Sequence, residues 1–92
     1  MVVYVDVRRP EEYAEARIPN ALNYNLEDEI AFVEAVKNLV ATLPADTEVV
    51  LYCHSSFRSS YAQSLLASRY SCLVGNLDGG LALYQGPLEY GT

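Results

Sequence analysis

Two short runs of β-prone residues constrain the fold of this chain more than any other feature. They are residues 2–5 (Val-Val-Tyr-Val) and residues 49–52 (Val-Val-Leu-Tyr). Neither run alternates apolar with polar residues, which is the pattern of strands buried on both faces, as in a parallel sheet. Two weaker strands are predicted at residues 21–24 and 72–75.

Helical patterns fill the connections between these strands. One helix is expected from Pro10, and a longer one over residues 27–42, with Asn25 as its N-cap and Pro44 ending it. Two further helices are expected to begin near Arg58 or Ser59 and after Gly79-Gly80. Strands and helices in strict alternation predict right-handed βαβ units and an α/β fold.

Size and charge limit the classes of function. The 92 residues suit one domain, residues 1–92, and 51% hydrophobic residues suffice for one core. A formal net charge of −6 argues against nucleic acid and anionic membrane surfaces as partners. No apolar run approaches the roughly 20 residues of a membrane span, and the start of the chain is too short and acidic for a signal peptide.

The cysteines and the histidine are too few for a structural zinc site without carboxylate ligands. Cys53 and Cys72 also lack the spacing of a redox CxxC pair. We therefore expect no metal, and free thiols in a cytoplasmic protein, or a periplasmic one if a signal peptide was removed. Cys72, at the start of a predicted core strand, is expected to be inert and not to form a disulfide with Cys53.

Cys53 is the candidate nucleophile because it directly follows a predicted buried strand. Ligands of open α/β sheets bind beyond the carboxyl ends of the strands. There, loop amides and the positive end of the next helix would stabilise a thiolate, and Arg58 would add a cation for an anionic substrate. Alternatively, Cys53 is simply a small buried hydrophobe. His54, similarly, is either a cation that lowers the pKa of the thiol or an exposed loop residue.

Four segments of the sequence resemble, in order, the motifs of the rhodanese-like domain family. They are DVRRPEEY at residues 6–13, IPNA at 18–21, the six-position loop at 53–58 and NLDGGL at 76–81. The resemblance implies a rhodanese-like fold, with a small, mostly parallel sheet of four to five strands flanked by helices. The sequence does not include the strand and helix that usually precede the first motif, so a minimal version of the domain is expected.

The resemblance also implies a sulfurtransferase of the thiosulfate:cyanide class. Cys53 would take a sulfur atom from an anionic donor such as thiosulfate, hold it as a persulfide and pass it to a thiol, cyanide or protein acceptor, without a cofactor. The implied substrate-binding residues are His54, Ser55, Ser56, Phe57, Arg58 and Ser59. Asp6 and Arg8 are expected to form a structural ion pair that supports the loop.

The chain departs from the family pattern at several positions, among them Arg17, where the family often has His, and Tyr84, where it often has Trp. Ser56 stands where the family often has Gly, which permits a positive φ and a close approach of the backbone. Phe57 replaces a commonly polar residue, and it either shields the persulfide or packs against the protein. Asn20 replaces the Gly of the IPGA turn, a mild change because Asn tolerates the left-handed region.

Two other functions compete with sulfur transfer. Related cysteine phosphatases separate Cys and Arg by five residues, whereas here four intervene, a tighter loop that suits a single sulfur atom. Catalytically silent rhodanese-like interaction modules usually lack the cysteine, whereas this chain keeps both Cys53 and Arg58. The donor, the acceptor and the oligomeric state are left open.

Overall fold

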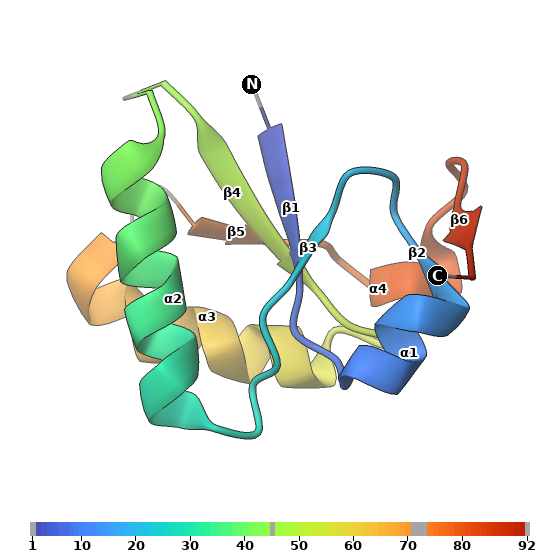
Figure 1. Cartoon of the computed structure of the whole chain (residues 1–92), viewed down its shortest axis with the longest axis horizontal. Coiled ribbons are helices and arrows are strands. Elements are labelled where there is room, and N and C mark those ends of the chain that lie inside the picture. Colours follow the sequence, from blue (N-terminus) through green and yellow to red (C-terminus); the bar gives the residue numbers. More distant parts are fainter. Residues whose placement is uncertain (1, 45, 71–73, 92) are drawn as a thin grey trace.

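The computed structural model describes residues 2–44, 46–70 and 74–91. Its centre is a parallel four-stranded sheet in the order β3-β1-β4-β5. The strands are β1 (Val2–Asp6), β3 (Leu22–Asn23), β4 (Glu48–Tyr52) and β5 (Val74–Asn76). The helices in the described residues are α1 (Pro10–Glu15), α2 (Glu29–Thr42), α3 (Phe57–Tyr70) and α4 (Gly80–Leu83). This is the expected small parallel sheet flanked by helices (Figure 1).

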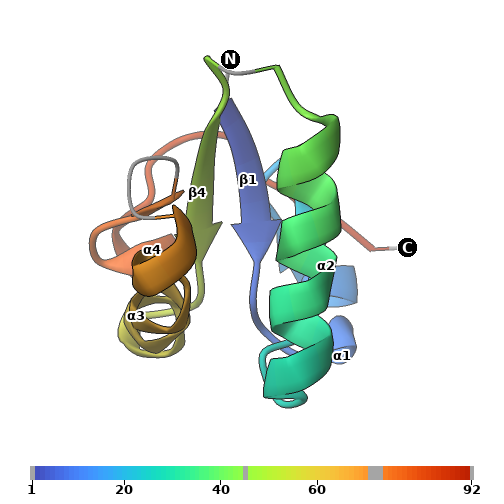
Figure 2. The same ribbon diagram turned by 90° about the vertical axis from the view of Figure 1, so that its left-hand side faces the viewer.

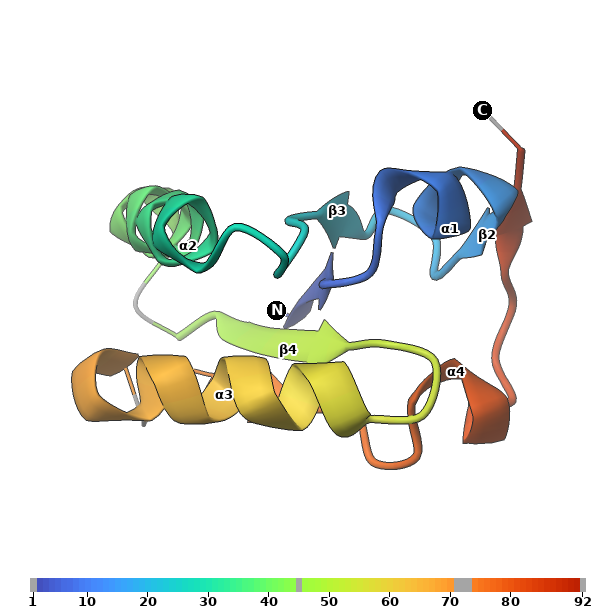
Figure 3. The ribbon, with the colours of Figure 1, turned by 90° about the horizontal axis from the view of Figure 1, so that it is seen from below.

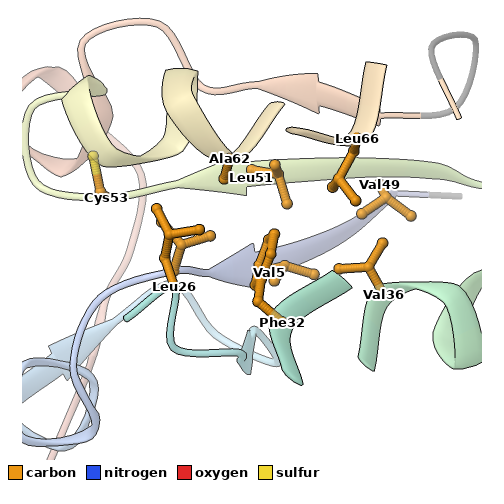
Figure 4. Close-up of a cluster of buried hydrophobic side chains, with 10 residues drawn as sticks. Val5, Leu26, Phe32, Val36, Val49, Leu51, Cys53, Ala62 and Leu66 are labelled. Carbon is orange, nitrogen blue, oxygen red and sulfur yellow. The ribbon is translucent and has the colours of Figure 1, made fainter. Parts of the chain in front are cut away.

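The main core lies where the two long helices meet the central strands. Alternate residues of β4 point to opposite faces of the sheet, so Leu51 and Tyr52 belong to different clusters. Figure 4 shows the cluster around Leu51, to which β1, β4 and both long helices contribute. Its strand members are Val5, Val49 and Leu51, and its helix members are Phe32 and Val36 of α2 and Ala62 and Leu66 of α3.

A second, smaller cluster surrounds the fully buried side chain of Tyr52. Ile18 and Ala21 are its other buried members, and partly buried residues such as Tyr13 and Leu81 pack against them. The Tyr52 hydroxyl accepts a hydrogen bond from the Ile18 backbone N–H at 3.1 Å. This cluster joins α1, α4 and the IPNA turn to the carboxyl end of the sheet, on the right of Figure 1.

The start of α2 differs from the sequence prediction. The helix begins at Glu29, and its N-cap is Asp28, whose carboxylate accepts a hydrogen bond from the Ala31 backbone N–H at 3.1 Å. Asn25 was therefore the wrong N-cap. Its side chain instead accepts from the Glu27 backbone N–H at 3.1 Å, a local turn that competes with helix formation.

Other boundaries differ by small amounts. Helix α3 begins at Phe57, one residue before the predicted start, and β3 covers only Leu22–Asn23. The sequence did not predict a two-stranded antiparallel sheet of β2 (Ala16–Arg17) with β6 (Glu89–Tyr90), because two-residue strands have no readable periodicity. Asn20 adopts a φ of 66°, the left-handed conformation expected for it. Cys72 lies outside the described residues.

Across residues 2–44, 46–70 and 74–91, no helix combines the length and apolarity that a membrane span requires.

Candidate active site

Cys53 immediately follows β4, and the chain then loops back into α3. Seen from below, this loop and the first turn of α4 lie side by side at the carboxyl end of the sheet (Figure 3). The backbone carbonyl of Cys53 accepts a hydrogen bond from the Leu81 N–H at 3.0 Å, and that of His54 accepts from the Ala82 N–H at 2.8 Å. The start of α4 therefore holds the backbone on which the cysteine is placed.

Gly80 makes this close approach possible. Its φ is +60°, and a Cβ at this position would lie 2.5 Å from the carbonyl oxygen of Cys53 and 2.7 Å from that of His54. Both atoms belong to the backbone, so a side chain could not be accommodated without moving the loop. The second glycine of the NLDGGL segment thus allows the backbone at the start of α4 to pack closely against the backbone of Cys53 and His54.

The Cys53 side chain is buried, with 1% relative exposure, and it belongs to the main core cluster. Its Sγ accepts a hydrogen bond from the Ser59 backbone N–H at 3.4 Å, and its thiol contacts the Ser59 hydroxyl at 3.6 Å. The cysteine is therefore buried and faces the first turn of α3, while its role as a nucleophile stays a prediction.

Two opposing effects act on the pKa of the Cys53 thiol. Burial is the larger single effect and raises the pKa, because a thiolate loses its hydration. Hydrogen bonds from the Ser59 backbone and hydroxyl, and from the backbone amides of Ser55 and Arg58, together outweigh burial and lower the pKa below its ordinary value. The loop therefore favours the nucleophilic form of the sulfur.

A hydrogen-bonded chain extends from Cys53 to the end of β5. The Ser59 hydroxyl lies 2.6 Å from Asn76 Oδ1, and Asn76 Nδ2 donates to Ser60 Oγ at 2.9 Å. Asn76 was not among the residues predicted for the site. The available signal was its place as the first residue of the NLDGGL segment, at the end of the strand next to β4.

The outer residues of the loop face solvent. His54 and Ser55 are exposed, and the Phe57 side chain is 86% exposed, so it does not pack against the core. Ser56 has a φ of 70°, the left-handed conformation for which the family often uses Gly. Its carbonyl accepts from the Ser60 N–H at 2.9 Å, which joins the loop to α3. The roles of these residues in substrate binding remain predictions.

Arg58, expected to be a cation for the substrate, already has a carboxylate partner. Its two terminal nitrogens donate to the two carboxylate oxygens of Glu12 in α1, at 2.7 and 3.0 Å. This bond from Arg58 lowers the pKa of Glu12 to about 2. Glu12 compensates the charge of Arg58, but the Arg58 side chain is 41% exposed, so its charge is also open to solvent.

Asp6 and Arg8 form a buried ion pair at the end of β1. Arg8 Nη2 donates to Asp6 Oδ2 at 2.6 Å and to the Ala16 carbonyl at 2.6 Å. The guanidinium also lies over the Tyr52 ring, 5.9 Å from its centroid. Because Tyr52 directly precedes Cys53, the pair packs against the strand end that carries the cysteine, whereas its support of the loop itself remains a prediction.

A cavity of about 310 Å³ opens beside the loop on the side of Arg58. It is lined by Val7, Arg9, Asn25, Leu26, Glu27, Glu29, Arg58 and Tyr61. Two of its lining residues, Val7 and Leu26, also belong to the core cluster that contains Cys53. In the described part of the chain, no group of three or more His, Cys, Asp or Glu side chains could hold a metal ion.

Comparison with known proteins assigns the family. Residues 1–86 match the family model of the rhodanese-like domain. A protein of Allochromatium vinosum named sulfurtransferase is 34% identical over 80 residues, which are 87% of this chain and 68% of that protein.

Solved structures support the same family. A rhodanese with anions from E. coli superposes with a TM-score of 0.73 and 26% identity, covering 99% of this chain and 100% of that one. The rhodanese-like domain of an Anabaena sp. protein gives a TM-score of 0.73 and 27% identity, covering 96% and 64%. The family model matches residues 1–86, and Cys53 lies at the carboxyl end of a parallel sheet. This chain therefore belongs to the rhodanese-like domain family.

Proposed function

We propose that this chain is a sulfurtransferase in which Cys53 carries a sulfur atom as a persulfide. The sulfur would come from an anionic donor such as thiosulfate and pass to a thiol, cyanide or protein acceptor. The observation that carries the proposal is the position of Cys53 Sγ, which accepts a hydrogen bond from the Ser59 N–H in the first turn of α3. This arrangement favours a thiolate, the form that attacks sulfur.

The reaction divides into two displacements. The Cys53 thiolate attacks the outer sulfur of thiosulfate, so that an S–S bond forms to Cys53 and the electron pair of the broken S–S bond leaves with sulfite. A nucleophilic acceptor then attacks the outer sulfur of the persulfide, takes it, and returns the electron pair to Cys53 as a thiolate. Covalent catalysis of this kind replaces one difficult transfer by two easier steps and requires no external oxidant or reductant.

Two further features support sulfur transfer. The thiol is 1% exposed, so a persulfide on it would be shielded from thiols in solution until an acceptor docks. Four residues separate Cys53 from Arg58, one fewer than in the related cysteine phosphatases, and a loop of this length suits a single sulfur atom better than a tetrahedral phosphate. The second feature favours a sulfurtransferase over a cysteine phosphatase.

Mass spectrometry of the intact protein tests the proposal. After incubation with thiosulfate and removal of excess reagent, wild type should gain the mass of one sulfur atom and lose it on addition of cyanide, with release of thiocyanate. Cys53→Ser should gain nothing while keeping the wild-type circular dichroism spectrum. A folded wild-type protein that takes up no sulfur from thiosulfate or from an organic persulfide would contradict the proposal and indicate an interaction module. Transfer activity in Cys53→Ser would equally contradict it.

A further inference from the structure

The Ser59 hydroxyl has a single hydrogen and more than one acceptor within reach. Asn76 Oδ1 lies 2.6 Å from Ser59 Oγ, the Ser56 carbonyl 3.3 Å away, and Cys53 Sγ 3.6 Å away. The shortest of these contacts takes the hydrogen, so Ser59 donates to Asn76. A lone pair of Ser59 Oγ then faces Cys53, which suits a neutral thiol that donates its own hydrogen.

This arrangement does not suit the thiolate. Once Cys53 has lost its proton, the contact with Ser59 is favourable only if the hydroxyl hydrogen points toward the sulfur. The hydrogen must then leave Asn76 Oδ1, and two oxygen atoms 2.6 Å apart would face each other with no hydrogen between them. An unmade bond between buried polar atoms is costly, and Ser59 is fully buried.

Asn76 can remove this conflict by turning its amide group. Its Oδ1 and Nδ2 each face a hydroxyl, that of Ser59 at 2.6 Å and that of Ser60 at 2.9 Å. A hydroxyl both donates and accepts, so the amide is satisfied in either orientation. After the turn, Nδ2 donates to Ser59, Ser59 donates to the Cys53 sulfur, and Ser60 donates to Oδ1. The backbone does not move, because Asn76 pairs with Leu51 of β4 and Leu77 N–H donates to the Leu51 carbonyl at 2.9 Å.

We propose that Asn76 is a positioning residue: its side-chain amide sets the direction of the Ser59 hydroxyl hydrogen and turns over when Cys53 gives up its proton to solvent. The thiol form has the amide oxygen toward Ser59, and the thiolate form has the amide nitrogen there. No bond between heavy atoms forms or breaks in this step. The inference deepens the proposed function, because the thiolate is the form that would accept sulfur.

The charged and titratable groups on the elements around the Cys53 loop are kept unchanged in every variant. They come from α1, β1, the loop itself, the turn after β5 and the segment before α2. They are Arg58 with its partner Glu12, Asp6 with its partner Arg8, His54, Asp78, and Glu27 with its partner Arg9.

Asn76→Asp tests the proposal because a carboxylate only accepts and so holds the Ser59 hydrogen permanently. The measurement is the pH dependence of Cys53 alkylation by iodoacetamide, read on the Cys53 peptide by mass spectrometry. The midpoint should rise by roughly one pH unit or more, the size of one lost hydrogen bond to a charged group. Asn76→Leu, which removes the amide without holding the hydrogen, should raise the midpoint by less.

A double-mutant cycle separates this effect from the added charge. In a Ser59→Ala background the hydroxyl is absent, so Asn76→Asp should shift the midpoint by less than half of its effect in wild type. A shift at least half as large would mean that the carboxylate acts directly through space, and the proposal would fall. It would also fall if Asn76→Asp gave no rise, or if Asn76→Leu shifted the midpoint as much as Asn76→Asp.

Ser60→Asp provides a second route if Asn76→Asp does not fold. Ser60 is exposed, and an acceptor there holds the Asn76 nitrogen outward and its oxygen toward Ser59. The midpoint should again rise, and again by less than half as much in the Ser59→Ala background; an equal rise in both backgrounds overturns the proposal. Sulfur uptake by wild type is measured separately, so failure of this inference is distinct from failure of the proposed function.

Discussion

The floor and the rim of the Cys53 loop are built in different ways. We define the floor as Cys53, Ser59 and Asn76, and the rim as His54, Ser55, Phe57 and Arg58. In the floor, Cys53 and Ser59 are almost completely buried, and they are held by backbone amides and short side-chain hydrogen bonds. In the rim, Phe57 is 86% exposed, and Arg58 is 41% exposed with a carboxylate partner.

The difference indicates how the two parts contribute to function. The floor positions the sulfur and, together with the backbone amides of Ser55 and Arg58, sets its pKa. The geometry of the floor depends on backbone atoms of β4, α3 and α4 and not on any single rim side chain. In the proposed function, the rim determines the charge and polarity that a donor or acceptor meets. Changes that reach the floor should therefore abolish the chemistry, whereas changes at the rim should alter the choice of substrate. Figure 2 shows the chain from the side, with β1 and β4 beside α2 and with α3 and α4 grouped beyond β4.

The largest effect is expected from Gly80→Ala, which breaks the floor. The new Cβ would meet the carbonyl oxygen of Cys53 at 2.5 Å, and φ is +60°. We expect a loss of roughly 2–4 kcal/mol in the free energy of unfolding and a loss of sulfur uptake of at least about tenfold. Urea denaturation and intact mass measure the two quantities. Gly91→Ala is the matched control, because Gly91 also has a positive φ, +77°, but a Cβ there meets nothing within 4 Å. Equal destabilisation by both substitutions would contradict this account.

Exchanging charges at the rim should change donor preference. Arg58→Ala should lower kcat/KM for thiosulfate by roughly tenfold, the value of one charged hydrogen bond, and should affect a neutral persulfide donor much less. Glu12→Gln should act in the opposite direction, raising kcat/KM for thiosulfate several-fold, since it removes the carboxylate that compensates Arg58 at 2.7 Å.

Lys37→Ala is the control for the positive charge that Arg58→Ala removes, because Lys37 is an exposed cation on α2. An equal loss with both donors in Arg58→Ala would show that Arg58 shapes the loop and does not recognise the anion.

Ser56→Gly sharpens the comparison where the floor meets the rim. A serine at a φ of 70° bears a steric cost that glycine does not, although glycine loses more chain entropy on folding. We expect a net gain of about 0.5–1 kcal/mol in the free energy of unfolding, measured by urea denaturation. Ser55→Gly, at the neighbouring position without a positive φ, should instead lose stability. A loss in Ser56→Gly comparable to that in Ser55→Gly would mean that the backbone at Ser56 carries no strain.

The smallest effect concerns acid stability of the rim. In the folded protein the pKa of Glu12 is about 2, against an ordinary value of 4.5, chiefly because Arg58 hydrogen-bonds to its carboxylate. The stabilisation that Glu12 provides is therefore complete above pH 4.5 and is lost as the pH falls toward 2. Since both side chains are partly exposed, the effect is small.

The free energies of unfolding of wild type and Glu12→Gln should differ at pH 6 and converge near pH 2. A difference that did not change with pH would show that Glu12 does not contribute through its charge.

The sequence alone determined the features that depend on local patterns. Apolar runs without alternation located β1 and β4, and Cys53 directly after the second run had to lie at the carboxyl edge of a parallel sheet. The residue type at Asn20 was sufficient to expect its left-handed backbone. These inferences hold because periodicity and conformational preference act within a few residues of the chain.

Only the tertiary structure decided which distant side chains meet. The partner of Arg58 is Glu12, 46 positions away, and the partner of Ser59 is Asn76, 17 positions away. Both pairs exist because the ends of α1, α3 and β5 come together at one edge of the sheet. No pattern within α3 shows whether Arg58 faces a substrate or a carboxylate, since that depends on the geometry of three separately formed elements. For the same reason, Cys53 and Ser59 were predicted from their place in the chain, whereas the contact between Ser59 and Asn76 appeared only once the strands were paired.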